Sequence, residues 1–219
     1  STVAELKIPS VSPWSPDKPA LYKIKFRLFD KGVLQDEYSL DFGFRTVSIK
    51  NGKILLNGKN IYLKGFGKHE DINIIGKGLS LPHLIKDHEL FRWIGANSYR
   101  TSHYPYSEEA MQMADRQGIL IIDETAANTL SMKAVTGTSL RKKLAENHKA
   151  QIKELFERDH NHPSVIIWSL GNECETYVPE TKGYFREIVK FAKSLDKSRP
   201  ITFVINSSPT TEQEAEIFD

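Results

Sequence analysis

The sequence has very little cysteine and no long hydrophobic run. Its single cysteine, Cys174, cannot form an internal disulfide, and paired Cys and His residues at metal-binding spacing are absent. No stretch of about eighteen consecutive apolar residues is present, so no transmembrane helix is predicted. We therefore expect no metal, no cofactor and no membrane partner. No basic region followed by an apolar core begins the sequence, and we expect a cytoplasmic protein.

The sequence also lacks an excess of charge of either sign. It contains 30 Lys and Arg against 28 Asp and Glu, which gives a net charge of +2. This balance does not indicate a nucleic-acid partner. At 219 residues, with 39% hydrophobic and 26% charged residues, the chain has the composition of an ordinary globular protein. It is long enough for one large or two small domains.

The first 45 residues predict a different kind of structure from the rest of the sequence. Residues 1–20 are rich in proline and predict an extended loop. Residues 21–29 alternate apolar and basic side chains, which indicates a half-exposed strand, and a turn at 30–32 leads into a second strand at 33–42. Two strands are too few for a domain, so this segment is interpreted as the last strands of a β-sandwich.

From residue 46 onward, a short hairpin at 47–56 is followed by alternating strands and helices. The expected strands cover 61–66, 97–101, 119–124, 165–172 and 201–206, and the expected helices cover 81–93, 108–117, 140–159 and 181–195. Such alternation indicates parallel strands joined by right-handed crossovers. A doubly wound sheet and a (β/α)₈ barrel both begin in this way.

Two observations favour the barrel. No Gly-x-Gly-x-x-Gly follows the first strand of the repeat, because Gly65-Phe66-Gly67 leads into Lys-His-Glu-Asp, and this argues against a dinucleotide site. Four of the five strands end in polar or charged residues, as expected for the carboxyl-terminal rim of a barrel. The fold class predicted is α/β, the first five β/α units of a TIM (β/α)₈ barrel.

The most informative stretch is 161–173, Asn-His-Pro-Ser-Val-Ile-Ile-Trp-Ser-Leu-Gly-Asn-Glu. An apolar run without alternation predicts a strand buried on both faces, and it delivers Glu173 to the rim. An Asn-Glu pair at a strand end is often a helix cap or an ion-pair partner. A glutamate after a fully apolar strand is expected to be partly desolvated, which suits a general acid. We favour the functional interpretation of Glu173.

Other rim residues have competing interpretations. His103 could be a core residue, a metal ligand or a substrate contact, and substrate contact is favoured because no second ligand lies at metal spacing. Arg100 lies on a strand and must pair with carboxylates if it faces the barrel interior. Asp123 and Glu124 are interpreted as structural rim residues, and residues 69–71 as a hydrogen-bonded loop.

Four segments together resemble glycoside hydrolase family 2. They are GFGKHED at 65–71, GANSYRTSHYPY at 95–106, DETAA at 123–127 and NHPSVIIWSLGNE at 161–173. The resemblance runs from about residue 10 to the end. Within the family, the first two segments are similar to members that hydrolyse β-D-glucuronides. The fourth is shared with β-galactosidases.

The resemblance implies roles for individual residues. Glu173 would be the acid/base of a retaining mechanism, and Asn172 would hydrogen-bond the sugar 2-hydroxyl. His103 would contact the sugar, and Asn206 matches an asparagine of the family's substrate pocket. Apart from the resemblance, Arg100 is also expected to bind the substrate. The family uses no cofactor in this reaction. The intact enzyme is expected to be a homo-oligomer.

The resemblance also implies that the chain is an internal fragment. A retaining glycosidase needs a second carboxylate about 5 Å from the acid, and the family places this nucleophile on the seventh barrel strand. The sequence ends where a sixth strand would begin, so the chain alone is expected to be inactive. An open barrel leaves two sheet edges, which predicts instability or association.

The expected domains are a remnant of an immunoglobulin-like β-sandwich at 1–45 and the first part of a catalytic barrel at 46–219. Two alternatives remain open at this point. One is another family 2 glycosidase, a β-galactosidase or β-mannosidase. The other is a non-catalytic carbohydrate-binding or assembly module.

Overall fold

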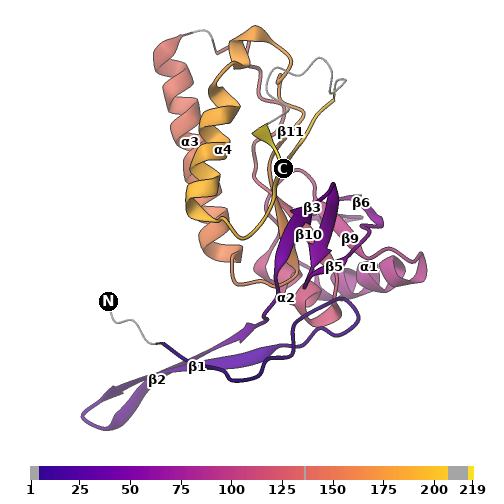
Figure 1. Cartoon of the computed structure of the whole chain (residues 1–219), viewed down its shortest axis with the longest axis vertical. Helices are drawn as coiled ribbons and strands as arrows, with labels where there is room; N and C mark the ends of the chain where they lie inside the picture. The colour runs from indigo at the N-terminus through magenta and orange to yellow at the C-terminus, as the bar shows by residue number, and fades with distance from the viewer. Residues whose placement is uncertain (1–4, 136, 207–216) are drawn as a thin grey trace.

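The computed structural model describes residues 5–135, 137–206 and 217–219. A long hairpin extends from a larger body in which helices pack on a parallel sheet (Figure 1). The hairpin consists of β1 (Tyr22–Asp30) and β2 (Val33–Phe42), antiparallel strands whose connection lies within the turn expected at 30–32. Lys31 and Gly32 occupy that turn with φ angles of 45° and 80°, the left-handed geometry of a tight hairpin.

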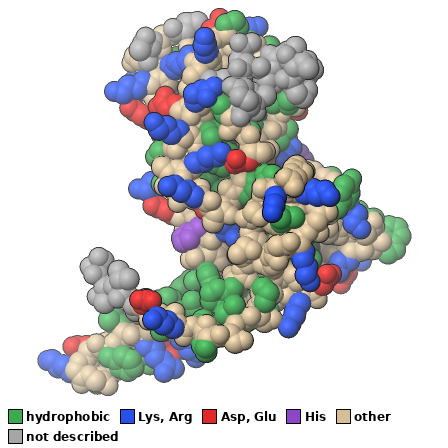
Figure 2. Space-filling view, viewed as in Figure 1, with side chains coloured by type: hydrophobic (Ala, Val, Ile, Leu, Met, Phe, Trp, Pro, Cys, Tyr) green, Lys and Arg blue, Asp and Glu red, His purple; other side chains and the backbone are tan. Residues whose placement is uncertain are grey.

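The alternation predicted for the hairpin is present. Phe26 pairs with Tyr38 and the two rings lie 6.5 Å apart, on the face opposite the ion pair of Arg27 with Glu37. Both aromatic side chains are more than half exposed. Figure 2 shows hydrophobic side chains gathered along this extension. The hairpin therefore presents an apolar face that no described segment covers.

A small antiparallel sheet follows the hairpin. It consists of β3 (Val47–Lys50), β4 (Lys53–Leu56) and β5 (Lys59–Asn60), and its first two strands form the hairpin expected at 47–56. Both of its turns use an Asn-Gly pair. Leu56 packs with Trp14 and with Leu120 and Ile166 of the parallel sheet. The small sheet thus covers the apolar residues near the amino-terminal ends of the central strands.

The central sheet contains five parallel strands in the order β12-β11-β10-β9-β6. This order follows the sequence without the reversal that marks a doubly wound sheet, and it is the order in which barrel strands are laid down. The strands are β6 (Gly65–Lys68), β9 (Ser98–Thr101), β10 (Leu120–Glu124), β11 (Val165–Asn172) and β12 (Ile201–Val204).

The first of these strands starts later than the sequence predicts. We expected a strand at 61–66, but Ile61 and Leu63 pack beside Leu56, and parallel pairing begins at Gly65. A Cβ atom at Gly65 would lie only 1.7 Å from the carbonyl oxygen of Ser98. The close approach of the Gly65 and Ser98 backbones therefore sets where β6 begins. The pattern of apolar residues in the sequence does not predict this approach.

Four helices connect the strands: α1 (Leu81–Trp93), α2 (Glu108–Gln117), α3 (Thr138–Asp159) and α4 (Tyr184–Leu195). The minor elements are β7 (Asp71–Ile72), β8 (Gly76–Lys77) and the 3₁₀ helix η1 (Pro179–Thr181). The predicted ends of α2 are confirmed, because Ser107 Oγ accepts from Ala110 N at 3.3 Å and Gly118 is left-handed. The helix expected at 181–195 begins only at Tyr184, because η1 precedes it.

The helices cover one face of the sheet. Trp168 of β11 stacks on Phe156 of α3 with ring centroids 4.1 Å apart, and Tyr99 of β9 is buried against Phe91 of α1. Trp168 and Tyr99 are therefore packing residues of the layer between the sheet and the helices. Arg100, on the strand between such positions, faces the other side. Among the described helices, none is long and apolar enough to cross a membrane.

Candidate active site

The centre of the rim is an ion pair between β9 and β10. Arg100 Nη1 lies 2.5 and 2.7 Å from the two carboxylate oxygens of Glu124, which is fully buried. Ser169 Oγ on β11 donates to the same carboxylate at 2.6 Å. The prediction that Arg100 pairs with a carboxylate is confirmed, and Glu124 has the structural role expected of it.

His103 joins this ion pair from the segment after β9. Its Nδ1 lies 3.3 Å from Arg100 Nη1 and 3.5 Å from Glu124 Oε1, and 26% of its side chain is exposed. The ring of His69 meets it edge to face, with centroids 5.1 Å apart. His103 therefore presents one side to the ion pair and the other to the open rim, where a ligand can reach it.

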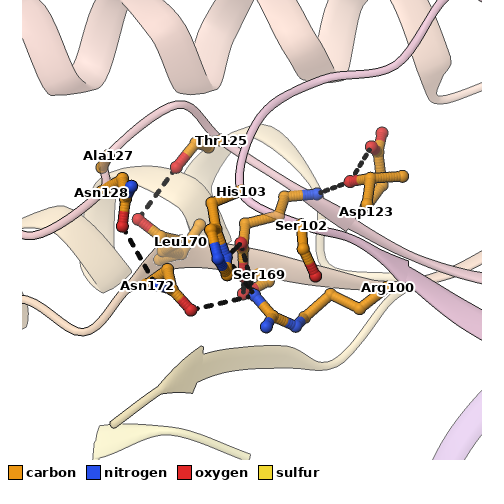
Figure 3. A network of polar contacts seen from close by, with 12 residues as sticks. Arg100, Ser102, His103, Asp123, Thr125, Ala127, Asn128, Ser169, Leu170 and Asn172 are labelled. Carbon is orange, nitrogen blue, oxygen red and sulfur yellow. Dashed lines mark hydrogen bonds and ion pairs between the residues drawn. The ribbon is translucent and has the colours of Figure 1, made fainter. Parts of the chain in front are cut away.

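Asn172, the last residue of β11, extends the same network. Its Oδ1 accepts from Arg100 Nη1 at 3.2 Å, and its Nδ2 donates to Asn128 Oδ1 at 3.0 Å. The side chain is 2% exposed. Three of the predicted site residues, Arg100, His103 and Asn172, thus lie in one hydrogen-bonded group (Figure 3).

Glu173 follows Asn172 directly and leaves the strand. Its backbone is in the left-handed region with φ of 49°, and its N–H donates to the Val204 carbonyl of β12 at 2.8 Å. The partial desolvation expected for this carboxylate is not present, because the side chain is exposed. All residues of β11 are buried, and the chain turns outward directly after the strand, at Glu173. The periodicity of apolar residues does not predict this turn. The adjoining thiol of Cys174 is buried, which raises its pKa to about 12 and keeps it in the neutral form.

Asn206 lies two residues beyond β12 and is exposed. Among the described residues, it is not part of the network around Arg100. The segment that follows it, 207–216, lies outside the described residues. The interpretation of Asn206 as a pocket residue therefore stays a prediction.

Asp123, beside Glu124 on β10, faces the helix layer. Its carboxyl is fully buried and accepts a hydrogen bond from Thr101 Oγ1 at 3.2 Å. Burial, and then the neighbouring carboxylate of Asp159, raise its pKa well above the ordinary value. The two adjacent acids therefore have opposite environments, since Glu124 is matched by a guanidinium while Asp123 faces a second carboxylate.

The loop at 69–71 is held by hydrogen bonds, as expected. Glu70 accepts from the backbone N–H of Ser107 at 3.4 Å, and its own N–H donates to the Tyr104 hydroxyl at 3.2 Å. Burial raises the pKa of the Glu70 carboxyl. In the part of the chain that the structure describes, no group of three His, Cys, Asp or Glu side chains is arranged to hold a metal ion.

The start of the signature stretch at 161–173 has a structural role. His162 Nδ1 donates to Asp115 Oδ2 at 2.5 Å, and the carbonyl of Val165 accepts from Arg45 at 2.6 Å and Arg199 at 2.7 Å. Burial would lower the pKa of His162, but the Asp115 carboxylate raises it above the ordinary value. These contacts fix the amino-terminal end of β11.

A cavity of about 350 Å³ lies at this same end of β11, beside Arg45, His162 and Arg199. It is therefore at the opposite end of the strand from Glu173. Its walls include Phe42 and Phe44, so it belongs to the junction of the hairpin with the sheet. The charged groups that the strand ends bring together lie at the other end of the sheet, at its carboxyl-terminal rim.

Sequence reasoning did not identify three residues of the network. Thr101 Oγ1 accepts a hydrogen bond from Glu124 N at 2.8 Å, and Ser169 Oγ donates one to the Glu124 carboxylate. Asn128 Oδ1 accepts a hydrogen bond from Asn172 Nδ2. A lone serine within the apolar run of β11 was an available signal for Ser169. Asn128 is in a loop without periodicity, and no sequence signal distinguishes it.

Comparisons with known proteins agree with this geometry. The pattern described as "Glycosyl hydrolases family 2, TIM barrel domain" matches residues 47–218, and that of "Glycosyl hydrolases family 2" matches residues 1–45. The β-glucuronidase of Paenibacillus borealis is 41% identical over 98% of this chain and 37% of its own length. Human β-glucuronidase is 41% identical over 100% of this chain and 34% of its own length. The chain spans about a third of the length of these curated relatives.

Solved structures give the same result. The β-D-glucuronidase of Dictyoglomus thermophilum superposes with a TM-score of 0.87 at 41% identity, covering 95% of this chain and 37% of that one. The β-glucuronidase of Ruminococcus gnavus, in complex with C6-substituted uronic isofagomine, gives a TM-score of 0.86 at 41% identity over 95% of this chain and 36% of its own. On the family match across both parts of the sequence, this chain belongs to glycosyl hydrolase family 2.

Proposed function

We propose that this chain is part of a retaining β-glucuronidase and that Glu173 is its acid/base. The observation that carries the proposal is the placement of Glu173. It leaves β11 exposed at the rim, directly after Asn172, which is fixed to the Arg100 network. A carboxyl group that is reachable by a ligand and adjoins a rigid hydrogen-bonding group can donate a proton to a glycosidic oxygen and later activate water.

The second carboxylate is proposed to come from a strand beyond the five described here. Glu124 is not suited to the role, because it is fully buried and both of its oxygens are bound by Arg100. Asp123 faces the helix layer and is also fully buried. We therefore propose that this chain is inactive alone. We also propose that residues 1–45 and 46–219 are parts of two domains, and that the complete enzyme is a homo-oligomer.

The substrate is tested by assaying the complete enzyme on nitrophenyl β-glucuronide, β-galactoside and β-mannoside. We expect kcat/KM to be highest for the glucuronide. Preference for either of the other sugars would support another family 2 glycosidase. Glycan binding without hydrolysis of any of the three would support a non-catalytic module.

Glu173→Gln tests the acid/base role. The amide cannot protonate the leaving group, so we expect general acid–base catalysis worth about 10²- to 10⁴-fold to be lost on substrates with poor leaving groups. A nitrophenolate leaves without protonation, so the first step should be less impaired on the nitrophenyl substrate. Added azide should then speed turnover, because it replaces water without needing a general base. Glu175→Gln, on the other side of Cys174, is the matched control, and an equal loss in the two variants would contradict the assignment.

A further inference from the structure

The loop after β10 holds Asn172 through both its main chain and its side chain. Asn128 Oδ1 accepts from Asn172 Nδ2 at 3.0 Å. In the backbone, Asn172 N donates to the Ala127 carbonyl at 2.9 Å, and Thr129 N donates to the Asn172 carbonyl at 2.8 Å. Asn128 is exposed whereas Asn172 is 2% exposed, so the contact joins the open rim to the buried network.

The hydrogen bonds determine which way the Asn172 amide points. The Arg100 guanidinium contains only donors, so the end of Asn172 that faces it, at 3.2 Å, must be the carbonyl oxygen. The NH₂ group must then face Asn128, whose contacting atom must be its own carbonyl oxygen. A rotation of the Asn172 amide by 180° would break both bonds and place its NH₂ against the guanidinium.

Among the described residues, this arrangement leaves part of the hydrogen-bonding capacity of the Asn172 amide unused. An amide NH₂ has two N–H donors and its carbonyl has two lone pairs. Asn128 uses one donor and Arg100 uses one lone pair, so one donor and one acceptor remain, both held in a fixed plane. Arg100 alone would restrain only the oxygen end of the amide, and Asn128 supplies the restraint at the nitrogen end.

We propose that Asn128 is a positioning residue for recognition of the sugar 2-hydroxyl. It fixes the Asn172 amide so that the remaining N–H is already oriented when the sugar binds, which avoids the cost of ordering it. The inference rests on the proposed function, and on the contact of Asn172 with the sugar 2-hydroxyl that the family resemblance implies. Asn128 itself acts through Asn172.

Kinetics of Asn128→Leu in the complete enzyme test the inference. We expect kcat/KM on nitrophenyl β-glucuronide to fall about 3- to 10-fold, the size of one neutral hydrogen bond. On the 2-deoxy analogue, which lacks the hydroxyl, the variant and the unchanged enzyme should have the same kcat/KM. A purely structural role for Asn128 would lower the values for both substrates equally, and that result would overturn the proposal.

Two further variants sharpen the test. Asn128→Asp keeps an oxygen acceptor, so it should restore most of the lost rate on the substrate with a 2-hydroxyl. Ala126→Ser adds a hydroxyl at an exposed position of the same loop and should leave both rates unchanged. If kcat/KM of Asn128→Asp on the substrate with a 2-hydroxyl is no higher than that of Asn128→Leu, the hydrogen-bond acceptor at residue 128 does not position Asn172, and the proposal is wrong.

A measurement that does not need activity separates this inference from the proposed function. In ¹⁵N spectra of the chain, the Asn172 side-chain N–H protons should shift and exchange faster with water in Asn128→Leu, and stay protected in Asn128→Asp. Unchanged Asn172 resonances in the leucine variant would overturn the positioning role. If the unchanged enzyme does not hydrolyse glucuronides, the proposed function is wrong. The spectra would still decide whether Asn128 positions Asn172.

Discussion

Two neighbouring acids, Asp123 and Glu124, show how far a residue's role can be read from sequence. Both were expected to be structural, and both are fully buried. The sequence also implied that Arg100 would need a carboxylate, since a guanidinium facing a barrel interior has to be paired. Which acid it binds depends on the alternation of β10, which turns Glu124 toward Arg100 and Asp123 toward Asp159.

The environment of Asp123 predicts a dependence of stability on pH. Its pKa is raised in the folded state, so its protonated form is favoured there. Its contribution to stability is fully present below the unfolded-state pKa of 3.8, and is lost as pH rises through the folded-state pKa. Each unit of elevation costs about 1.4 kcal/mol once pH exceeds both values.

Asp123→Asn should therefore be more stable than the unchanged chain at neutral and alkaline pH, with a smaller loss of stability as pH rises above the unfolded-state pKa of Asp123. The amide can still accept from Thr101 and can donate toward Asp159 without ionising. Urea unfolding at several pH values measures this difference. Asp123→Leu is the control, because it removes charge and hydrogen bonds together and should destabilise the chain at every pH. A parallel pH dependence in the asparagine variant and the unchanged chain would contradict the prediction.

At the scale of elements, the strand and helix order was predictable because periodicity and caps are local. The end of β11 was not, because it depends on contacts between segments distant in sequence. Gly171 lies where the Ala127 loop and β12 approach the strand, and a Cβ atom there would be 2.8 Å from both the Ala127 carbonyl oxygen and Phe203 Cε2. This close packing places Asn172 and Glu173 at the rim.

Gly171→Ala should therefore destabilise the chain by about 1–3 kcal/mol through overpacking. It should also lower kcat/KM of the complete enzyme, because Asn172 and Glu173 would move with the strand. Gly78→Ala is the matched control, since a Cβ atom there meets nothing closer than 3.8 Å and its φ lies outside the left-handed region. Urea unfolding and nitrophenyl glucuronide kinetics provide the two measurements. Equal stability of the two alanine variants would show that β11 can shift without cost.

At the scale of the whole molecule, the described residues leave two sheet edges unpaired and one apolar strand face uncovered. β6 and β12 each pair with one neighbour in the central sheet, and so form its edges. The hairpin has an apolar face on which Phe26, Leu28 and Tyr38 are 55%, 63% and 58% exposed. The opposite face, with Arg27 and Glu37, is charged. Sequence alternation predicted these two faces, and only the structure shows that the apolar one is uncovered.

The purified chain should therefore associate as its concentration rises, because an exposed apolar strand face and open sheet edges both favour pairing with another copy. Leu28→Lys places a charge in the middle of the apolar face and should reduce this association. Ser39→Lys adds the same charge to the polar face and is the control. Sedimentation velocity over a range of concentrations measures the effect. If both lysine variants associate as strongly as the unchanged chain, the edges β6 and β12 drive assembly; if the unchanged chain stays monomeric, neither surface does.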